Sequence, residues 1–283
     1  MSKRLEAIFS QPAKGKTRLI AYLMAGDPTP ETSLRRLKGL ADHGVDVLEL
    51  GVPFSDPIAD GPVIQAAGER ALRAGMTLAK TLKLVRGFRA SHETPVLLMG
   101  YLNPLLRYGW GKFVQDAVDA GVDGLILPDL PWREGTNLRT ETRRLVGTQL
   151  SFIPIVAQTS QTEDLLELSK VSQGFVYVLS RNGITGGEAE LSPKVTEFIN
   201  GLEQHTHLPR CVGFGIQNTE QVCRLASYCD GVVIGSAIVH RFSELDKKGL
   251  SETELFKEEG AILEWVAELN STKTYRNGSL ESG

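Results

Sequence analysis

Three carboxylates lie close together in one short segment, LELGVPFSDPIADGP, at positions 48–62. The first of them, Glu49, stands between Leu48 and Leu50 in a run that has the character of a strand. A carboxyl group surrounded by leucines loses its hydration, which raises its pKa and lets it hold a proton near neutral pH. We therefore interpret Glu49 as a candidate general acid. The alternative is a strand-end glutamate that is paired with a lysine or an arginine.

The second candidate, Asp60, follows in a loop that Pro53, Pro57 and Pro62 make rigid. We expect a wetter setting there, in which the carboxylate stays ionised and accepts a hydrogen bond. Two acids in unlike environments give one site both a proton donor and an anion. Asp56 has a weaker claim, because a residue directly before proline is typical of a turn.

Three glycine-containing motifs suggest an anion site. They are GITGG (183–187), GFG (213–215) and GSA (235–237), and each follows a short apolar run. Glycine lets backbone N–H groups approach an anion closely. A helix that begins at Ser236 would add its positive end and a hydroxyl group. Together the motifs predict a phosphate site, although one such motif alone would fit an ordinary turn.

Eight short apolar runs, each followed by a turn and in most cases by a segment with helical periodicity, must position these groups. The runs are rich in valine, isoleucine and leucine and mostly do not alternate, which is typical of parallel strands buried on both faces. They span residues 18–25, 47–51, 95–101, 124–129, 152–158, 175–180, 210–215 and 231–236. Because parallel neighbours need crossover helices, the pattern predicts an α/β fold, a single closed (βα)8 TIM barrel. An open doubly wound sheet is the alternative.

The remaining segments extend this prediction. Two extra helices are expected after the second strand, at 63–75 and 77–92, and a short amphipathic helix at 5–11 is expected to cover the bottom of the barrel. The catalytic domain then spans residues 1–268. The polar tail, 269–283, is predicted to be disordered.

Composition excludes several classes of function. The 283-residue chain has a formal net charge of -3, which gives no electrostatic case for nucleic-acid binding. No apolar run reaches the roughly 20 residues that span a bilayer. The three cysteines are an odd set without metal-site spacing, so we expect no metal site and read them as reduced packing residues of a cytoplasmic protein.

In a barrel of this kind the site lies at the carboxyl ends of the strands and in the loops that follow. Tyr22, Tyr101 and Tyr177 lie near the ends of the first, third and sixth runs. The candidate acids and the glycine motifs lie at the same ends. Polar groups should therefore converge on one rim.

The motifs LELGVPFSDPIADGP, YVLSRNGITG, GFGI and GSAIV occur in this order, and the chain that carries them resembles the tryptophan synthase α subunit family. The resemblance extends from about Arg18 to the last helix. The first motif is highly specific, whereas the glycine motifs alone would fit many phosphate-binding barrels. The family is a (βα)8 barrel that cleaves indole-3-glycerol phosphate into indole and glyceraldehyde 3-phosphate.

The resemblance implies a role for each candidate residue. Glu49 would protonate indole C3, and it is a candidate to take the proton of the glycerol hydroxyl. Asp60 would accept the indole N–H and stabilise the positive charge that develops on the ring. Tyr22 and Tyr101 are implied to line the indole slot. Tyr177 and Thr185 are implied to lie near the substrate and the mobile loop. The phosphate pocket is implied to consist of Gly186, Phe214, Gly215, Gly235 and Ser236. For Tyr22 and Tyr101 the alternative is a packing role alone.

The resemblance also implies a partner. The family works as an α2β2 complex, a heterotetramer in which the β subunit holds pyridoxal phosphate and joins indole to serine. The chain itself would then need no cofactor. Asp56 and Pro57 would face the β subunit, and residues 181–188 would close as a lid when that partner is engaged.

The chain departs from the family pattern at four positions. Gln158 stands where many members have proline, Asn182 replaces a smaller residue, Ile184 stands for valine, and Tyr22 often corresponds to phenylalanine. None of these changes removes an acid or a phosphate glycine. They bear on the movement of the lid and the response to a partner more than on activity.

Three other functions remain open from the sequence. One is a free-standing lyase that releases indole without a partner. Another is a binding subunit that only activates a β partner, against which the intact acids and glycine motifs argue. The last is a different phosphosugar enzyme such as an isomerase, which would need a catalytic lysine or histidine at a strand end, and the sequence offers none.

Overall fold

The computed structural model describes residues 1–10, 17–160, 165, 168, 173–179, 193–213 and 215–271. Within these ranges, parallel strands form one sheet in the order β5-β4-β3-β2-β1-β9-β8-β7-β6. The strands are β1 (Arg18–Met24), β2 (Val47–Gly51), β3 (Val96–Met99), β4 (Gly124–Ile126), β5 (Ser151–Phe152), β6 (Ile155–Ala157), β7 (Val176–Leu179), β8 (Arg210–Gly213) and β9 (Gly231–Ile234). Each of the eight predicted runs contains at least one of them.

The sheet closes through β5 and β6, which are two halves of the run predicted as one strand at 152–158. The Ile153 N–H donates to the Leu125 carbonyl at 2.9 Å, and the Pro154 carbonyl accepts from the Tyr177 N–H at 2.8 Å. Proline has no N–H to donate, so the strand is interrupted at Pro154. One half pairs with β4 and the other with β7. The barrel is therefore closed, which confirms the predicted (βα)8 fold over the open sheet.

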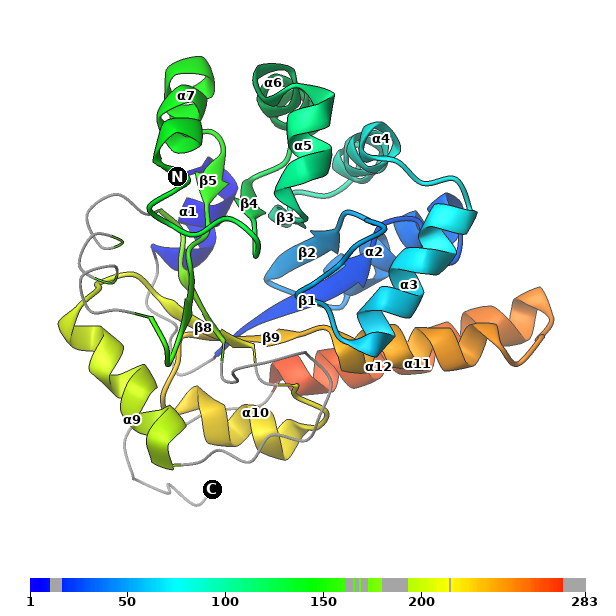
Figure 1. Cartoon of the computed structure of the whole chain (residues 1–283). Coiled ribbons are helices and arrows are strands. Elements are labelled where there is room, and N and C mark those ends of the chain that lie inside the picture. Colours follow the sequence, from blue (N-terminus) through cyan, green and yellow to red (C-terminus); the bar gives the residue numbers. More distant parts are fainter. Residues whose placement is uncertain are drawn as a thin grey trace.

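Helices surround the strands (Figure 1). They are α1 (Lys3–Phe9), α2 (Pro30–Asp42), α3 (Pro62–Arg73), α4 (Leu78–Arg89), α5 (Leu102–Tyr108), α6 (Trp110–Ala120), α7 (Thr136–Val146), α9 (Pro193–Gly201) with the 3-10 turn η1 (Leu202–Gln204), α10 (Thr219–Ala226), α11 (Ser236–Asp246) and α12 (Glu252–Ser271). The two extra helices predicted after the second strand are α3 and α4.

Local sequence signals set several helix ends. The side chains of Thr29, Thr77 and Asn218 each accept a hydrogen bond from the backbone N–H of the residue three positions later. They thereby cap the N-termini of α2, α4 and α10. Gly121 ends α6 at a φ of 89°, in the left-handed region that glycine enters without strain. Helices α2, α3, α10, α11 and α12 contact the strands directly.

The hydrophobic core has two parts. An outer core fills the space between strands and helices, and an inner core lies inside the ring of strands. The inner core takes one buried residue from most strands or their flanks and one from α1: Leu5, Ile20, Val47, Leu97, Ile126, Ile153, Phe175, Cys211 and Val233. Because Leu5 packs among the strand residues, α1 covers the bottom of the barrel as predicted.

A buried carboxylate, Asp123, holds this lower end together. Asp123 Oδ1 accepts from Ser2 Oγ at 2.9 Å, and Oδ2 accepts from Arg89 Nη2 at 2.6 Å and from the Val96 N–H at 2.9 Å. Hydrogen bonds and a cation thus satisfy this buried charge. It is a structural acid at the end of the barrel away from the predicted site.

The domain continues beyond residue 268, because α12 runs through Ser271. Leu269 and Asn270 are buried, and Asn270 Nδ2 donates to the Gly44 carbonyl. The first residues of the predicted tail are therefore part of the last helix, and residues 272–283 lie outside the described ranges. None of the helices that the structure describes is long and apolar enough to cross a membrane.

Candidate active site

The alternation of side chains along β2 places Glu49 inside the barrel. Val47 belongs to the inner core, whereas Leu48 and Leu50 pack in the outer core. Because successive strand residues point to opposite faces, Glu49 points inward, one layer above Val47 and nearer the carboxyl end of the strand. Its side chain is 1% exposed.

The same step of two residues along the other strands defines one layer around the axis. The residues of this layer, each two positions after an inner-core residue, include Tyr22, Glu49, Met99, Tyr177, Gly213 and Gly235. Glu49 is the Cα partner of Tyr22 on β1 and of Leu97 on β3. Four of the predicted site residues therefore meet directly above the inner core.

Burial, and second to it the negative charge of Asp60, raise the pKa of Glu49 from 4.5 to about 8. Its Oε2 atom is buried and, in the described part of the chain, has no hydrogen-bond partner. No described lysine or arginine forms an ion pair with this residue, which disfavours the alternative of a structural pair. At neutral pH Glu49 is thus a protonated acid that faces the barrel interior.

Asp60 precedes α3, and only 8% of it is exposed. Burial raises its pKa to about 6, and a hydrogen bond with Tyr101 works in the opposite direction. Asp60 is therefore buried, although less completely than Glu49, in agreement with the expected difference between the two settings. What favours the ionised form of Asp60 relative to that of Glu49 is less complete burial together with the tyrosine donor, so that near pH 7 one acid is charged and the other is neutral.

Tyr101 organises the loop that carries Asp60. Its hydroxyl accepts the Ala59 N–H at 3.0 Å, and its ring lies 5.3 Å from that of Phe54. The Asp60 carbonyl accepts from Gln65 Nε2 at 2.8 Å. Tyr101 therefore positions Asp60. The sequence had suggested only that Tyr101 lines the indole slot. The sequence offered no signal for Phe54, because its contact with Tyr101 is tertiary.

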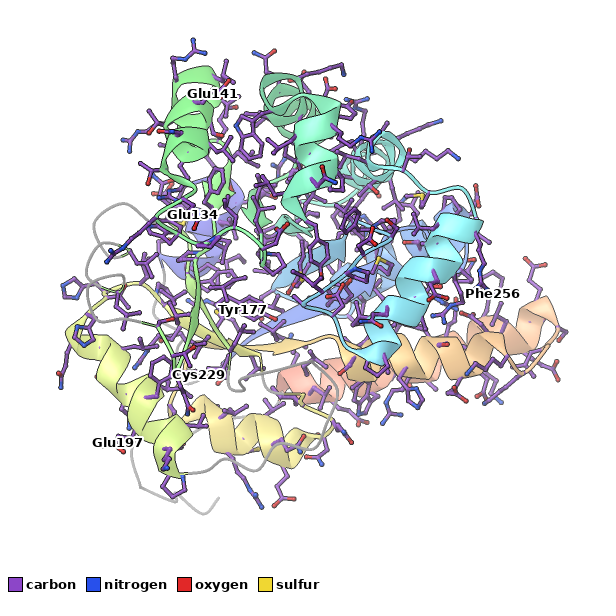
Figure 2. All side chains as sticks on the ribbon, viewed as in Figure 1. Glu134, Glu141, Tyr177, Glu197, Cys229 and Phe256 are labelled. Carbon is purple, nitrogen blue, oxygen red and sulfur yellow. The ribbon has the colours of Figure 1, made fainter. Side chains whose placement is uncertain are left out.

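Tyr177 comes from the opposite side of the barrel. It follows inner-core Phe175 by two residues, and Figure 2 shows it near the middle of the ring, away from Glu141 and Glu197 on the outer helices. A Cβ at Gly213 would lie 2.9 Å from the Tyr177 ring, so glycine there makes room for the ring. Burial, then the charge of the nearby Glu49, raises the pKa of its hydroxyl well above 10.

The described part of the predicted phosphate pocket lies at the ends of β8 and β9. Gly215 has a φ of 64°, which an L side chain rarely adopts. Gly235 precedes α11, which begins at Ser236 as predicted, and as the N-cap residue it has no side chain to cap the first turn. A helix N-terminus of this kind attracts anions. Ser236 also lines a cavity of about 800 Å3 together with residues of α3, α11 and α12 and the loop after β8.

Several predicted residues do not join this group. Thr185, Gly186 and Phe214 lie outside the described residues, as does the predicted lid at 181–188. Asp56 is exposed and accepts from Ser55 Oγ in the loop after β2, as a turn residue would. The structure describes no group of acidic, histidine and cysteine side chains that could hold a metal ion.

The fold and the site define a (βα)8 barrel whose candidate acids lie at the carboxyl ends of its strands, where the sites of barrel enzymes lie. The model of the tryptophan synthase alpha chain family matches residues 9–265. The chain belongs to the tryptophan synthase alpha chain family, and its role is that of an alpha subunit in tryptophan biosynthesis.

Solved structures agree with this family. A tryptophan synthase alpha chain from Legionella pneumophila subsp. pneumophila is 34% identical, with coverage of 95% of this chain and 97% of that chain and a TM-score of 0.83. The alpha subunit from Legionella pneumophila str. Paris is 35% identical over 95% and 98% of the two chains, with a TM-score of 0.85. A chain of tryptophan synthase from M. tuberculosis in an aminoacrylate-bound form is 32% identical over 95% and 100%, with a TM-score of 0.80.

Proposed function

We propose that this chain is a carbon–carbon lyase that cleaves indole-3-glycerol phosphate into indole and glyceraldehyde 3-phosphate. One observation carries the proposal. Glu49 faces the barrel interior with an Oε2 atom that has no hydrogen-bond partner among the described residues and with a pKa of about 8, and the charge of the more acidic Asp60 acts on it. A protonated acid and an ionised carboxylate side by side are what a retro-aldol cleavage at an indole ring requires.

The reaction can be written with these two groups. Glu49 gives its proton to indole C3, and the electron pair of the C2–C3 double bond forms the new C–H bond. The ring becomes an indolenine, whose positive charge Asp60 stabilises by accepting the N1–H. The bond between C3 and the chain then breaks, its electrons restore the indole, and the adjacent hydroxyl becomes the aldehyde as its proton returns to the Glu49 carboxylate.

The phosphate group would lie against Gly215, Gly235 and Ser236, where backbone N–H groups and the first turn of α11 favour negative charge. Thr185 and Gly186 stay predictions for the same ligand. Because proton transfer by Glu49 and charge stabilisation by Asp60 complete the reaction, we propose that the chain itself uses no cofactor. Pyridoxal phosphate would belong to the β partner alone.

The test is an assay of the purified chain with indole-3-glycerol phosphate, in which indole and glyceraldehyde 3-phosphate are both quantified, with and without a tryptophan synthase β subunit. The proposal expects equal amounts of the two products, formed slowly by the chain alone and faster with the β subunit. Strong cleavage that the β subunit does not change would favour the free-standing lyase. Absence of both products under both conditions would favour the activating subunit.

The partner proposal concerns the loop after β2. Asp56 and Pro57 line a cavity of about 770 Å3 there, and the side chain of Ile58 beside them is 80% exposed. An apolar residue this exposed is a candidate anchor for a protein partner. We propose that this loop contacts the β subunit in an α2β2 heterotetramer in the cytoplasm, where the free Cys211, Cys223 and Cys229 would stay reduced.

Ile58→Asp should weaken the affinity for the β subunit about tenfold, since it places a charge where an apolar anchor is buried on binding. Titration of the β subunit against indole release measures the effect. The rate of the isolated variant should equal that of the wild type. The matched control is Phe256→Asp on α12, because Phe256 is also exposed, at 46%. Equal behaviour of the two variants would contradict the assignment of this loop to the interface.

A further inference from the structure

Tyr22 lies between the predicted phosphate pocket and the two acids. At the backbone end of the Tyr22 side chain, a Cβ placed on Gly235 would lie 3.2 Å from Tyr22 Cβ. At the other end, a Cβ at Gly51 would lie 2.0 Å from the Tyr22 hydroxyl oxygen. Between these ends Tyr22 is the Cα partner of Glu49. The ring therefore extends from the start of α11 across β1 to the end of β2, alongside the proposed acid.

Among the residues that the structure describes, the hydroxyl of Tyr22 has only a weak partner. The residue is 5% exposed, and the contact that the described structure gives its hydroxyl is to the thioether Sδ of Met24, at 3.9 Å. A thioether is a poor acceptor, and a buried hydroxyl is normally satisfied by a stronger one. Gly51 has no side chain that could take this place. The hydroxyl is thus available to a ligand.

The electrostatic surroundings keep this hydroxyl a donor. Burial, and after it the negative charge of Asp60, raises the pKa of Tyr22 well above 10. The phenol therefore stays protonated throughout the neutral range. It can donate a hydrogen bond to an oxygen atom placed beside Gly51, at the end of the ring away from Gly235.

The proposed substrate can bring an oxygen atom to that end of the ring. Its indole ring and its phosphate are joined by a three-carbon chain that carries two hydroxyl groups. If the phosphate lies at Gly235 and indole C3 lies at Glu49, the chain passes along Tyr22. We propose that the Tyr22 hydroxyl binds a hydroxyl group of this chain and so makes the site prefer a hydroxylated chain over a plain alkyl chain. This inference rests on the proposed function.

The experiment compares two ligands in two proteins. The ligands are indole-3-glycerol phosphate and indole-3-propyl phosphate, which has the same ring and phosphate but lacks both chain hydroxyls. Dissociation constants are measured in the Glu49→Gln background, where the first ligand should not be cleaved, with Tyr22 intact or changed to phenylalanine. Loss of the hydroxyl should weaken binding of the glycerol ligand about threefold to tenfold. Binding of the propyl ligand should change less than about twofold.

Tyr108→Phe is the matched control, since its hydroxyl donates to Asp116 at 2.6 Å between α5 and α6 and lies outside the proposed site. It should change neither dissociation constant. An equal loss for both ligands in Tyr22→Phe would assign Tyr22 to packing and overturn the inference, and so would no loss for either. A wild-type chain that cleaves no indole-3-glycerol phosphate would instead overturn the proposed function on which the inference rests.

Discussion

Glu49→Gln should lower the rate of indole release by about 10³-fold, within the range that general acid catalysis supplies. Glutamine has nearly the same shape, but it cannot give a proton to indole C3 or recover one from the chain hydroxyl. The proposed phosphate pocket at Gly235 and Ser236 is not altered by this substitution, so indole-3-propyl phosphate should still bind. Single-turnover indole release and the dissociation constant of this ligand together measure the effect.

The free energy of unfolding shows whether the lower rate of Glu49→Gln comes from lost proton transfer or from a folding defect. Burial gives Glu49 a pKa of about 8 in the folded chain, against 4.5 ordinarily. Below pH 4.5 the group is protonated in both states and contributes nothing, and between pH 4.5 and 8 the wild type loses stability as pH rises. Glu49→Gln avoids this loss, so its free energy of unfolding at pH 8 should exceed that of the wild type.

The control is Glu197→Gln on α9, at the outside of the barrel (Figure 2). It should keep wild-type activity and wild-type stability. Indole release by Glu49→Gln at a rate near that of this control would contradict the assignment of Glu49 as the acid.

Asp60→Asn should slow cleavage by about 10² to 10³-fold, the loss typical of removing one preorganised group that stabilises charge in a transition state. Asparagine can still contact the indole N–H, but it carries no charge to balance the indolenine. The loss should therefore fall on kcat rather than on KM. Steady-state kinetics over a range of substrate concentrations separates the two.

The matched control for this variant is Asp56→Asn, four positions earlier in the same loop, where the carboxylate is exposed. Without a β subunit it should leave kcat and KM near their wild-type values. A change of KM alone in Asp60→Asn would show that Asp60 only binds the ground state, contrary to the mechanism.

Sequence patterns predicted the barrel because its strands are apolar on both faces, and that property is local. They did not predict the division of the fifth strand at Pro154, which depends on the pairing of its halves with different neighbours. They also did not place a helix at 102–108. Both carboxylate oxygens of Asp129 accept the Leu102 N–H that begins α5, and this contact joins segments far apart in the chain.

The site shows the same limit. The apolar run that contains Glu49 made a buried strand predictable, but Leu48 and Leu50 point to the outer face, so the side chains that bury the carboxyl group come from the barrel interior. The burial of Asp60 was missed, because a polar, proline-rich loop gives no sign that it folds over the barrel mouth. The contacts of Tyr101 with Ala59 and Asp60 were equally hidden, since they join the end of β3 to the loop after β2.

The pH dependence of kcat/KM for indole release tests most directly the claim that one acid is protonated while the other is ionised. Protonation of Asp60 should reduce the rate below about pH 6, and ionisation of Glu49 should reduce it above about pH 8. The account predicts a bell-shaped profile with its maximum near pH 7. A rate that keeps rising through pH 8 and beyond would mean that a carboxylate rather than a carboxylic acid is required at Glu49, and would contradict the account.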